Sequence, residues 1–334
     1  MRRMVAVLTV ILLLFSIGCA APLEPAPAAE HLLRFSVNTD QDSPSGIAAQ
    51  TLADMVCDRS EGRIVLVPFF DDTLGDEGAV MEQLALGGID LGFISLQQLS
   101  EEYEEMQIFC LPYLFSNRNT FFAAVEAGLC DSLYEQLQED SLHALTWFDQ
   151  GALSFCSSKW GLTTPDSFLM QTTAVTAGAI ACDTVTALGA EALLINRASI
   201  SAAYDAHLVS IAEVSLLDYL TANIYSCAPY LMLDEHIYTP ALLVMGQPAT
   251  DRLSPSDIAL IRECAAEAAA YGRQLQQETE LAALASLVDK GVHVSLTSEL
   301  QISDFRAAAL RVYVRYTPAH RSLYDRIVAF RNKN

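Results

Sequence analysis

Cysteine and histidine are the side chains in this protein that most readily bind metals, so their spacing decides which metal chemistry is open to it. The chain has eight cysteines and six histidines, but no two cysteines form a C-x-x-C pair and the histidines are dispersed. Zinc sites need closely spaced ligands, so we predict no metal site. Seven cysteines follow Cys19, an odd number that leaves at least one free thiol, and we interpret them as small buried hydrophobic residues: Cys57, Cys110, Cys130, Cys156, Cys182, Cys227 and Cys264.

Catalytic groups would form the second kind of site. An enzyme needs a nucleophile beside a base, or paired acids in a cleft. The sequence contains no G-x-S-x-G, H-E-x-x-H or glycine-rich phosphate loop, and we interpret its acidic pairs Asp71-Asp72 and Glu104-Glu105 as solvated surface. We therefore expect no enzyme activity, no catalytic residue and no cofactor.

Cys19 is the residue whose surroundings predict a covalent modification. Arg2 and Arg3 precede an apolar run at residues 5–17, which has the length of a secretion-signal core and is too short to span a membrane. The following Ser16-Ile17-Gly18-Cys19 resembles a lipoprotein signal-peptidase site. We therefore predict lipidation of Cys19, which would anchor the secreted protein to a membrane.

The alternative to lipidation is plain cleavage near Ala20-Ala21, which would release a soluble protein. With lipidation, residues 1–18 form the signal peptide and residues 19–30 form a tether rich in proline and alanine. An extended chain of this kind reaches about 35 Å.

Composition limits the class of protein and its partners. The chain has 334 residues, is 52% hydrophobic and carries a formal charge of −22. Its length predicts roughly two domains of about 150 residues each. We locate the only basic cluster at Arg2-Arg3, in the leader, so we expect no nucleic-acid partner.

Residues 81–95, MEQLALGGIDLGFIS, predict a helix that passes directly into a buried strand. Apolar residues at helical spacing end at Gly87-Gly88, which provides a left-handed stop, and residues 89–93 then alternate as a strand. In an open α/β sheet the carboxyl end of such a strand, here Ser95-Leu96, faces the crevice where small ligands bind. Two further βα steps before it predict a mostly parallel sheet.

Two chain crossings and one long helix predict the domain organisation. We predict that the chain crosses into a second lobe at Gly151 and that strands at 230–234 and 241–245 bring it back. A helix from Ser254 to about Lys290 would be about 50 Å long. It either spans both lobes or forms a coiled coil, and we favour spanning because its leucines sustain no heptad. We predict lobe I at 31–150 plus 240–279, lobe II at 151–239 plus 280–310, and a C-terminal helical segment at 311–334.

The run QLALGGIDLGFIS, with LPYLF, TPDSF and LGAEAL elsewhere in the chain, resembles the solute-binding proteins of TRAP (tripartite ATP-independent periplasmic) transporters, the DctP family. The resemblance implies an α/β, two-lobed periplasmic-binding-protein-like fold with hinge strands and a long helix spanning both lobes. It implies capture of a small organic ligand between the lobes, delivery to the membrane permease subunits and, in some systems, a periplasmic tetratricopeptide-repeat partner. The alternative from another class is a ligand-binding sensor or scaffold lipoprotein derived from the same fold.

Three positions depart from what the resemblance implies. Family members typically carry ligand-binding arginines at the positions of Leu153 and Ala174 and an asparagine at the position of Val214. A carboxylate buried there without a guanidinium would lose roughly 2–5 kcal/mol. We therefore expect a hydrophobic or amphipathic ligand.

Arg197 stands where the family commonly places an aromatic residue on the ligand. It either turns inward and binds an acid group in a new pose, or it faces solvent at the start of a helix. The predicted ligand-binding set is Asn38, Ser95, Leu96, Gln150, Leu153, Ala174, Val175, Arg197, Val214 and Tyr219.

The lipid anchor predicts how the protein partitions. Cys19→Ala should move the protein from the detergent phase to the aqueous phase in a phase-partition assay, because the variant lacks the acyl chains that hold it in the membrane. Unchanged partitioning would contradict lipidation.

Overall fold

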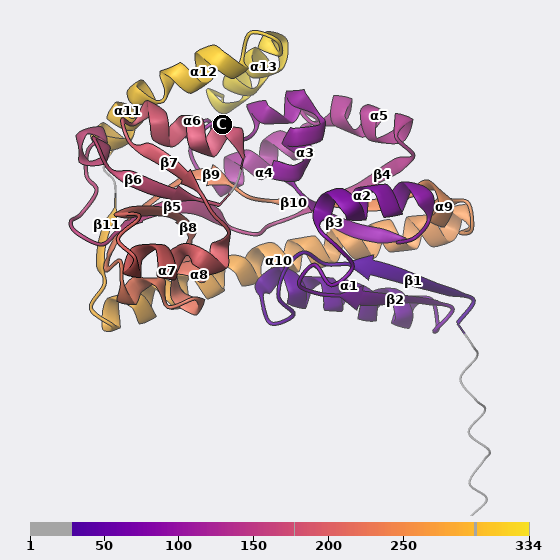
Figure 1. Cartoon of the computed structure of the whole chain (residues 1–334). Coiled ribbons are helices and arrows are strands. Elements are labelled where there is room, and N and C mark those ends of the chain that lie inside the picture. Colours follow the sequence, from indigo (N-terminus) through magenta and orange to yellow (C-terminus); the bar gives the residue numbers. More distant parts are fainter. Residues whose placement is uncertain (1–28, 177, 297–298, 334) are drawn as a thin grey trace, which may run out of the picture.

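Two β-sheets form the framework of the protein, and the computed structural model describes residues 29–176, 178–296 and 299–333 (Figure 1). Within these residues the first sheet, lobe I, has the strand order β2-β1-β3-β10-β4, and the second, lobe II, has the order β11-β9-β5-β8-β6-β7. The strands of lobe I are β1 (His31–Ser36), β2 (Ile64–Phe69), β3 (Leu91–Ser95), β4 (Leu142–Phe148) and β10 (Ala241–Gly246). Those of lobe II are β5 (Ala152–Ser157), β6 (Thr172–Val175), β7 (Glu191–Leu194), β8 (Ile211–Ser215), β9 (Tyr230–Tyr238) and β11 (His293–Leu296).

Helices cover both sheets. Lobe I carries α1 (Pro44–Arg59), α2 (Glu77–Leu86), α3 (Leu96–Glu102), the 3-10 helix η1 (Glu104–Ile108), α4 (Arg118–Glu126), α5 (Asp131–Glu139) and α9 (Gln247–Thr250). Lobe II carries η2 (Pro165–Phe168), α6 (Ala179–Ala187), η3 (Arg197–Ser199), α7 (Ile200–Asp205), α8 (Leu216–Thr221) and η4 (Ile224–Ser226). The α/β fold class expected from the sequence is confirmed.

The helix-start and helix-stop residues seen in the sequence begin and end helices in the structure. The Ser43 side chain accepts the backbone N–H of Gly46, and Pro44 occupies the first turn of α1. At the end of α2, Gly87 adopts φ 79° and its N–H bonds back to the helix, which turns the chain toward β3. The predicted passage from helix to buried strand at 81–95 is confirmed.

The sheet of lobe I is mostly parallel, as the βα steps predict, and β10 is the exception. Strands β1, β2 and β3 run parallel, but β10 runs antiparallel to both of its neighbours, β3 and β4. The reason is the connectivity, since β10 enters lobe I on its return from lobe II. Counting βα steps before β4 could not reveal β10, because this strand enters the sheet only after the chain has passed through lobe II.

The long helix α10 (Pro255–Asp289) has 35 residues, about 50 Å, and begins at Ser254, whose side chain accepts the N–H of Asp257. Its first half contributes Ile261 and Ala268 to the core of lobe I, and its second half contributes Leu287 to the core of lobe II. Figure 1 shows α10 running along both sheets. The spanning helix favoured over a coiled coil is confirmed.

The C-terminal helices α11 (Glu299–Ala308), α12 (Leu310–Tyr316) and α13 (Arg321–Arg331) cross over the top of the molecule (Figure 1). Helix α12 packs on α6 of lobe II, and α13 packs on α4 of lobe I. The Tyr313 hydroxyl donates to the Pro112 carbonyl at 2.7 Å, and Arg315 pairs with Asp183 at 2.7 Å. These helices therefore attach to both lobes.

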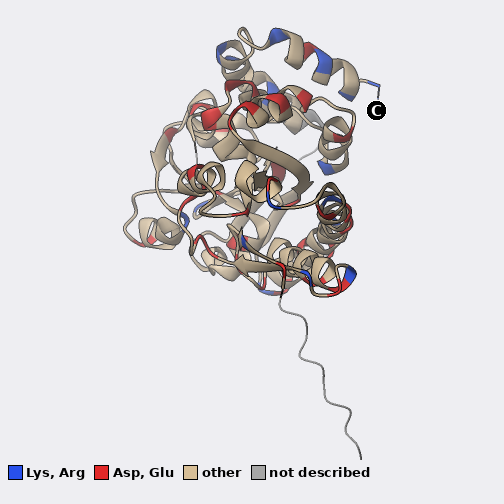
Figure 2. Cartoon of the chain, turned by 90° about the vertical axis from the view of Figure 1, so that its right-hand side faces the viewer, with Lys and Arg blue, Asp and Glu red and all other residues tan. Residues whose placement is uncertain are grey.

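A second basic segment lies in α12 and α13. The prediction that Arg2-Arg3 is the only basic cluster is therefore wrong. Helices α12 and α13 carry five arginines and a single acidic residue, Asp325, within an otherwise acidic chain. Figure 2 shows this gathering of Lys and Arg near the C-terminus. The residues are spaced four to six apart along the chain, so no run of consecutive charges marks them: Arg311, Arg315, Arg321, Arg326 and Arg331.

Among the residues described, no helix is both long enough and apolar enough to cross a membrane. Cys19 and the predicted leader lie outside the described residues.

A buried polar cluster sits in lobe II. His236 has Nε2 at 2.9 Å from Glu213 Oε1 and Nδ1 at 3.1 Å from Asp234 Oδ2, and all three side chains are fully buried. Tyr113, which reaches in from lobe I, donates its hydroxyl to Asp234 at 2.7 Å. Burial lowers the pKa of His236, but the two carboxylates outweigh it and raise that pKa to about 9.

This cluster predicts a pH dependence of stability. The folded-state pKa of His236 lies above its ordinary value of 6.5, so the stabilisation is complete below about pH 6.5 and is lost as pH rises through about 9. The free energy of unfolding, measured by denaturant titration across that window, should fall with rising pH. His236→Gln should remove this fall and lower stability by about 3–5 kcal/mol at neutral pH, because two buried carboxylates lose their cation. A parent protein whose stability does not change over the window would contradict the assignment, whether or not the variant folds.

Candidate functional site

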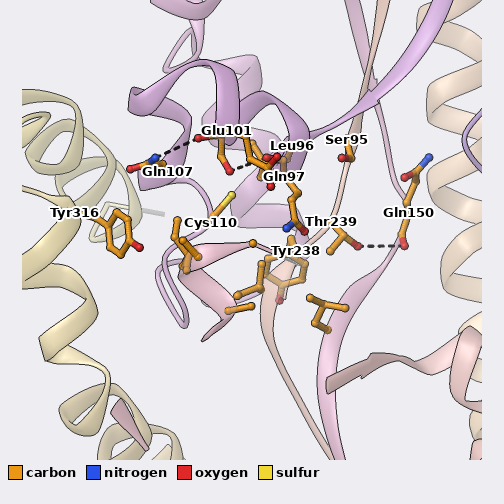
Figure 3. Close-up of a pocket in the computed structure, with 17 residues that line it drawn as sticks. Ser95, Leu96, Gln97, Glu101, Gln107, Cys110, Gln150, Tyr238, Thr239 and Tyr316 are labelled. Atoms are coloured by element: carbon orange, nitrogen blue, oxygen red, sulfur yellow. Dashed lines mark hydrogen bonds between the residues drawn. The ribbon is translucent and has the colours of Figure 1, made fainter. Parts of the chain in front are cut away.

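A cavity of about 420 Å³ lies between the lobes (Figure 3). Lobe I supplies α3 and the end of η1, the two crossing strands supply the floor, and lobe II supplies the first turn of α6. Tyr316 of α12 lies on one side and Gln150 on the opposite side (Figure 3). The lining residues are Ser95, Leu96, Gln97, Ser100, Glu101, Gln107, Cys110, Gln150, Leu153, Gly178, Ala179, Ile180, Ala181, Ile237, Tyr238, Thr239 and Tyr316.

The cavity continues toward solvent as a second, more open space of about 560 Å³. It shares Ser95, Gln97, Glu101 and Gly178 with the first, and lobe II adds the residues that follow β6 and end β7. Strand ends of the two lobes thus face each other across the opening, as expected for a ligand crevice in an α/β protein. We call the two spaces the inner cavity and the mouth.

Glu77 organises the polar wall of lobe I. Its Oε2 accepts the N–H of Ser95 at 2.9 Å and the Ser95 hydroxyl at 2.6 Å, and its Oε1 accepts from the Asn38 amide. Gln150 in turn donates to Asn38 Oδ1 at 2.8 Å and to Ser45 Oγ at 3.3 Å. Three residues predicted separately, Asn38, Ser95 and Gln150, are therefore joined through a glutamate that sequence reasoning missed.

Ser95 is held in place twice. It is the last residue of β3 and also the N-cap of α3, where its hydroxyl accepts the N–H of Gln98 at 3.1 Å. This geometry fixes where α3 begins, and α3 brings Leu96, Gln97 and Glu101 to the cavity. The predicted placement of Ser95-Leu96 at a strand end facing the crevice agrees with the structure.

The charge that lines the two spaces is negative. Of the described residues that line the inner cavity or the mouth, Glu101 is the only charged one, and none is lysine, arginine or histidine. The apolar part comes from Leu96, Leu153, Ile180 and Ile237, with the tyrosine rings beside them. Such a wall offers dispersion contacts and amide hydrogen bonds to a ligand, but no guanidinium or ammonium for an acid group.

Arg197 lies at the mouth, beside Asn196, and does not turn inward. Its guanidinium pairs with Asp218 at 2.7 Å and its side chain is 64% exposed. Partial burial and the carboxylate of Glu77 raise the pKa of Asp72 in lobe I, while Arg197 acts in the opposite direction. Arg197 therefore lies between carboxylates of both lobes, which agrees with the solvent-facing alternative.

Other predicted residues lie away from both spaces. Ala174, Val214 and Tyr219 belong to the hydrophobic core of lobe II, and the Tyr219 hydroxyl donates to the Ala228 carbonyl at 2.6 Å. Val175 belongs to the neighbouring cluster around Phe155. Their contacts with a ligand stay predictions, whereas Ser95, Leu96, Gln150 and Leu153 line the inner cavity.

Several lining residues carried no signal in the sequence. Cys110 was interpreted as core, and burial does raise the pKa of its thiol to about 12, yet it contributes to the cavity wall. Tyr316 comes from a helix more than 200 residues after α3, so no local pattern connects it with the site.

A charged cluster lies directly behind the cavity, where the chain first crosses between the lobes. The Arg118 guanidinium of α4 lies 3.0 Å from Asp149 and 2.6 Å from Glu280 of α10, and its side chain is only 9% exposed. Burial raises the pKa of Asp149 to about 6, although Arg118 opposes this. Glu235, on the second crossing strand, also has its pKa raised, chiefly by burial. Arg118 thus faces the charges of three carboxylates at the junction.

Comparisons with known proteins show the family and the fold of the chain. The model of the bacterial extracellular solute-binding proteins, family 7, matches residues 35–318. A solute-binding protein from Chromohalobacter salexigens is 24% identical over 280 residues, covering 84% of this chain and 83% of that protein.

Two solved structures are similar in fold. A TRAP periplasmic solute-binding protein from a Sulfitobacter species, with bound β-D-galacturonate, superposes with a TM-score of 0.81 at 24% identity, covering 90% of this chain and 99% of the other. One from Ochrobactrum anthropi, with its C-terminus bound in its ligand-binding pocket, gives 0.86 at 19% identity, covering 92% and 96%. The two-lobed fold expected from the sequence is confirmed.

The junction predicts a large effect of removing one cation. Arg118→Met should lower the free energy of unfolding by about 3–5 kcal/mol near neutral pH, because buried Asp149 and half-buried Glu280 lose their ion pair with Arg118. Part of the loss should return as pH falls, beginning above about 6, because Arg118 lowers the pKa of Asp149 in the parent and its removal raises that pKa further. A carboxylate with a raised folded-state pKa destabilises the fold only while it is ionised.

The matched control is Arg321→Met, which breaks the exposed Arg321–Asp325 pair of α13 and should cost at most about 0.5 kcal/mol. Equal losses for the two variants in urea titrations would contradict a special role for Arg118.

Proposed function

Because this chain belongs to family 7 of the bacterial extracellular solute-binding proteins, the DctP family of TRAP transporters, we propose that its inner cavity captures a hydrophobic or amphipathic organic solute for delivery to a membrane permease. The family is one of transport proteins and not of enzymes. The observation that carries the proposed ligand class is the absence of any cationic side chain among the described residues that line the cavity and its mouth.

An acid ligand fits this wall poorly. The Sulfitobacter relative holds a sugar acid, β-D-galacturonate, but a carboxylate that leaves water needs a charged donor to replace its hydration. Here Leu153 occupies one position where the family resemblance implies a guanidinium, and Arg197 already pairs with Asp218. A sugar acid would therefore bury an unpaired charge beside Glu101.

An apolar ligand gains from the same wall. Covering about 250 Å² of apolar ligand surface would supply about 6 kcal/mol at 25 cal/mol per Å², before the costs of ordering. The cavity of about 420 Å³ lies within the usual range for small-molecule sites. Leu96, Leu153 and Ile237 provide surface on lobe I and on both crossing strands, so lobe closure would enclose the ligand from several sides.

We also propose the setting in which the protein works. It acts in the periplasm, held to a membrane through a lipid on Cys19, and meets the permease subunits and a periplasmic tetratricopeptide-repeat protein. The units that close on the ligand are residues 31–150 plus 240–279 and residues 151–239 plus 280–310. The leader pattern and the spanning helix support these assignments.

The ligand class predicts a pattern of thermal shifts. Neutral apolar compounds should raise the melting temperature of the purified protein, whereas C4-dicarboxylates, galacturonate and glucuronate should leave it unchanged, because the wall lacks a cation for them. Micromolar binding of a dicarboxylate or sugar acid would overturn the proposed ligand class.

A gain-of-function variant sharpens this measurement. Leu153→Arg places a guanidinium in the wall and should introduce measurable binding of galacturonate. The control, Leu86→Arg, adds the same charge at an α2 residue that is 77% exposed and should introduce none.

A further inference from the structure

The structure points to a more specific ligand, a deduction that rests on the proposed function: we infer that the solute carries a cationic head, an amine or quaternary ammonium, which binds at Glu101 while its apolar part fills the inner cavity. Both the position of Glu101 and the arrangement of charges around it support this inference.

Glu101 stands where the two spaces meet. It lines both the inner cavity and the mouth, so a ligand entering the cavity passes its carboxylate. Among the described residues no arginine, lysine or histidine forms an ion pair with it, and its side chain is exposed. The next residue, Glu102, accepts instead from Gln98 at 3.4 Å and lines neither space. Glu101 is thus an available anion at the entrance of an apolar cavity.

Neighbouring side chains add to the negative charge that Glu101 gives the cavity entrance. Glu77 lies behind Ser95, where its carboxylate accepts only from neutral amide, hydroxyl and backbone groups, so its negative charge is not cancelled by these partners. The positive charge of Arg197 could offset these carboxylates, but Arg197 forms an ion pair with Asp218 at 2.7 Å. Carboxylates gathered at a cleft with low-dielectric walls concentrate a negative potential there, which attracts cations and repels acids.

Two tyrosine rings suit the same ligand. The Tyr316 hydroxyl donates to Asp183 at 2.7 Å and the Tyr238 hydroxyl donates to Glu235 at 3.3 Å. Because both hydroxyls already bond to protein carboxylates, these residues offer the cavity mainly their aromatic rings. Aromatic rings attract ammonium groups as well as apolar groups, so the wall suits a cationic amphipath at both of its ends.

The test compares three probes that share a phenylpropyl tail and differ only in the head, which is an ammonium, a hydroxyl or a carboxylate. Calorimetric titration at low ionic strength should give the ammonium probe about tenfold higher affinity than the hydroxyl probe, with the carboxylate probe weakest. Added salt should reduce the difference, because the head group lies near solvent.

Two variants locate the effect. Glu101→Gln should abolish the preference for ammonium and leave the affinity of the hydroxyl probe nearly unchanged, since the apolar contacts remain. Glu102→Gln, which removes the neighbouring charge outside the cavity, should keep at least most of the preference. Both residues are exposed, so neither substitution threatens the fold.

The outcomes separate the two proposals. Equal binding of ammonium and hydroxyl probes would overturn the cationic head and leave the apolar ligand class standing. Preferential binding of the carboxylate probe would overturn the cationic head as well. Binding of sugar acids or dicarboxylates without response to any phenylpropyl probe would overturn both proposals. An ammonium preference that survives Glu101→Gln, or a protein that ignores the ammonium probe, would also overturn the inference.

Discussion

Arg118 balances one buried and two half-buried carboxylates at the place where the chain crosses between lobes, and the site depends on that junction. Asp149 precedes the first crossing, Glu235 lies on the second and Glu280 comes from the helix that spans both lobes. Charges this far from water are tolerated only when a partner compensates them. The Nε of Arg118 lies 3.0 Å from Asp149 without the alignment of a hydrogen bond, so the pair is held mainly by charge. The net negative balance of the cluster leaves the junction sensitive to protonation.

The ligand site inherits its geometry from this junction. Gln150 and Leu153 follow Asp149 on the first crossing, and Tyr238 and Thr239 follow Glu235 on the second, so the junction residues and the cavity floor are neighbours in sequence. From lobe I, the Glu77 carboxylate joins Asn38 and Ser95 to this floor through hydrogen bonds. The cavity is consequently shaped by polar groups that are already paired with one another, and the wall left for a ligand is largely apolar.

The C-terminal helices complete the cavity from outside the two sheets. Asp183 of α6 accepts from both Arg315 and Tyr316, and this bonds α12 to lobe II beside the first turn of α6. Arg331 of α13 donates to the Leu114 carbonyl of lobe I at 3.0 Å. Arg315 thus forms an ion pair with lobe II and Arg331 a hydrogen bond with lobe I, so basic side chains attach this segment to an acidic body. The same attachment places the Tyr316 ring in the cavity wall.

Sequence alone determined those features that depend on neighbours along the chain. Gly87 ends α2 because the left-handed conformation at this position favours glycine. Ser43 and Ser254 cap helices through their own side chains. The residues after Pro255 continue without a helix-breaking signal, and this sets the length of α10. The motif resemblance gave the two-lobed fold for a similar reason, since it compares residues in order.

Only the tertiary structure decided which side chains reach the ligand. Ala174 and Val214 stand on strands of lobe II, and packing turned both into its core. The Arg197 side chain binds the carboxylate of Asp218, 21 positions away in the sequence, and does not turn into the cavity. Glu77 and Tyr316 joined the site although no sequence pattern connects them with Ser95. Periodicity and capping act within a few residues, whereas the direction and charge balance of a side chain depend on groups that only folding brings near, and that is why the sequence specified the framework and the fold specified the site.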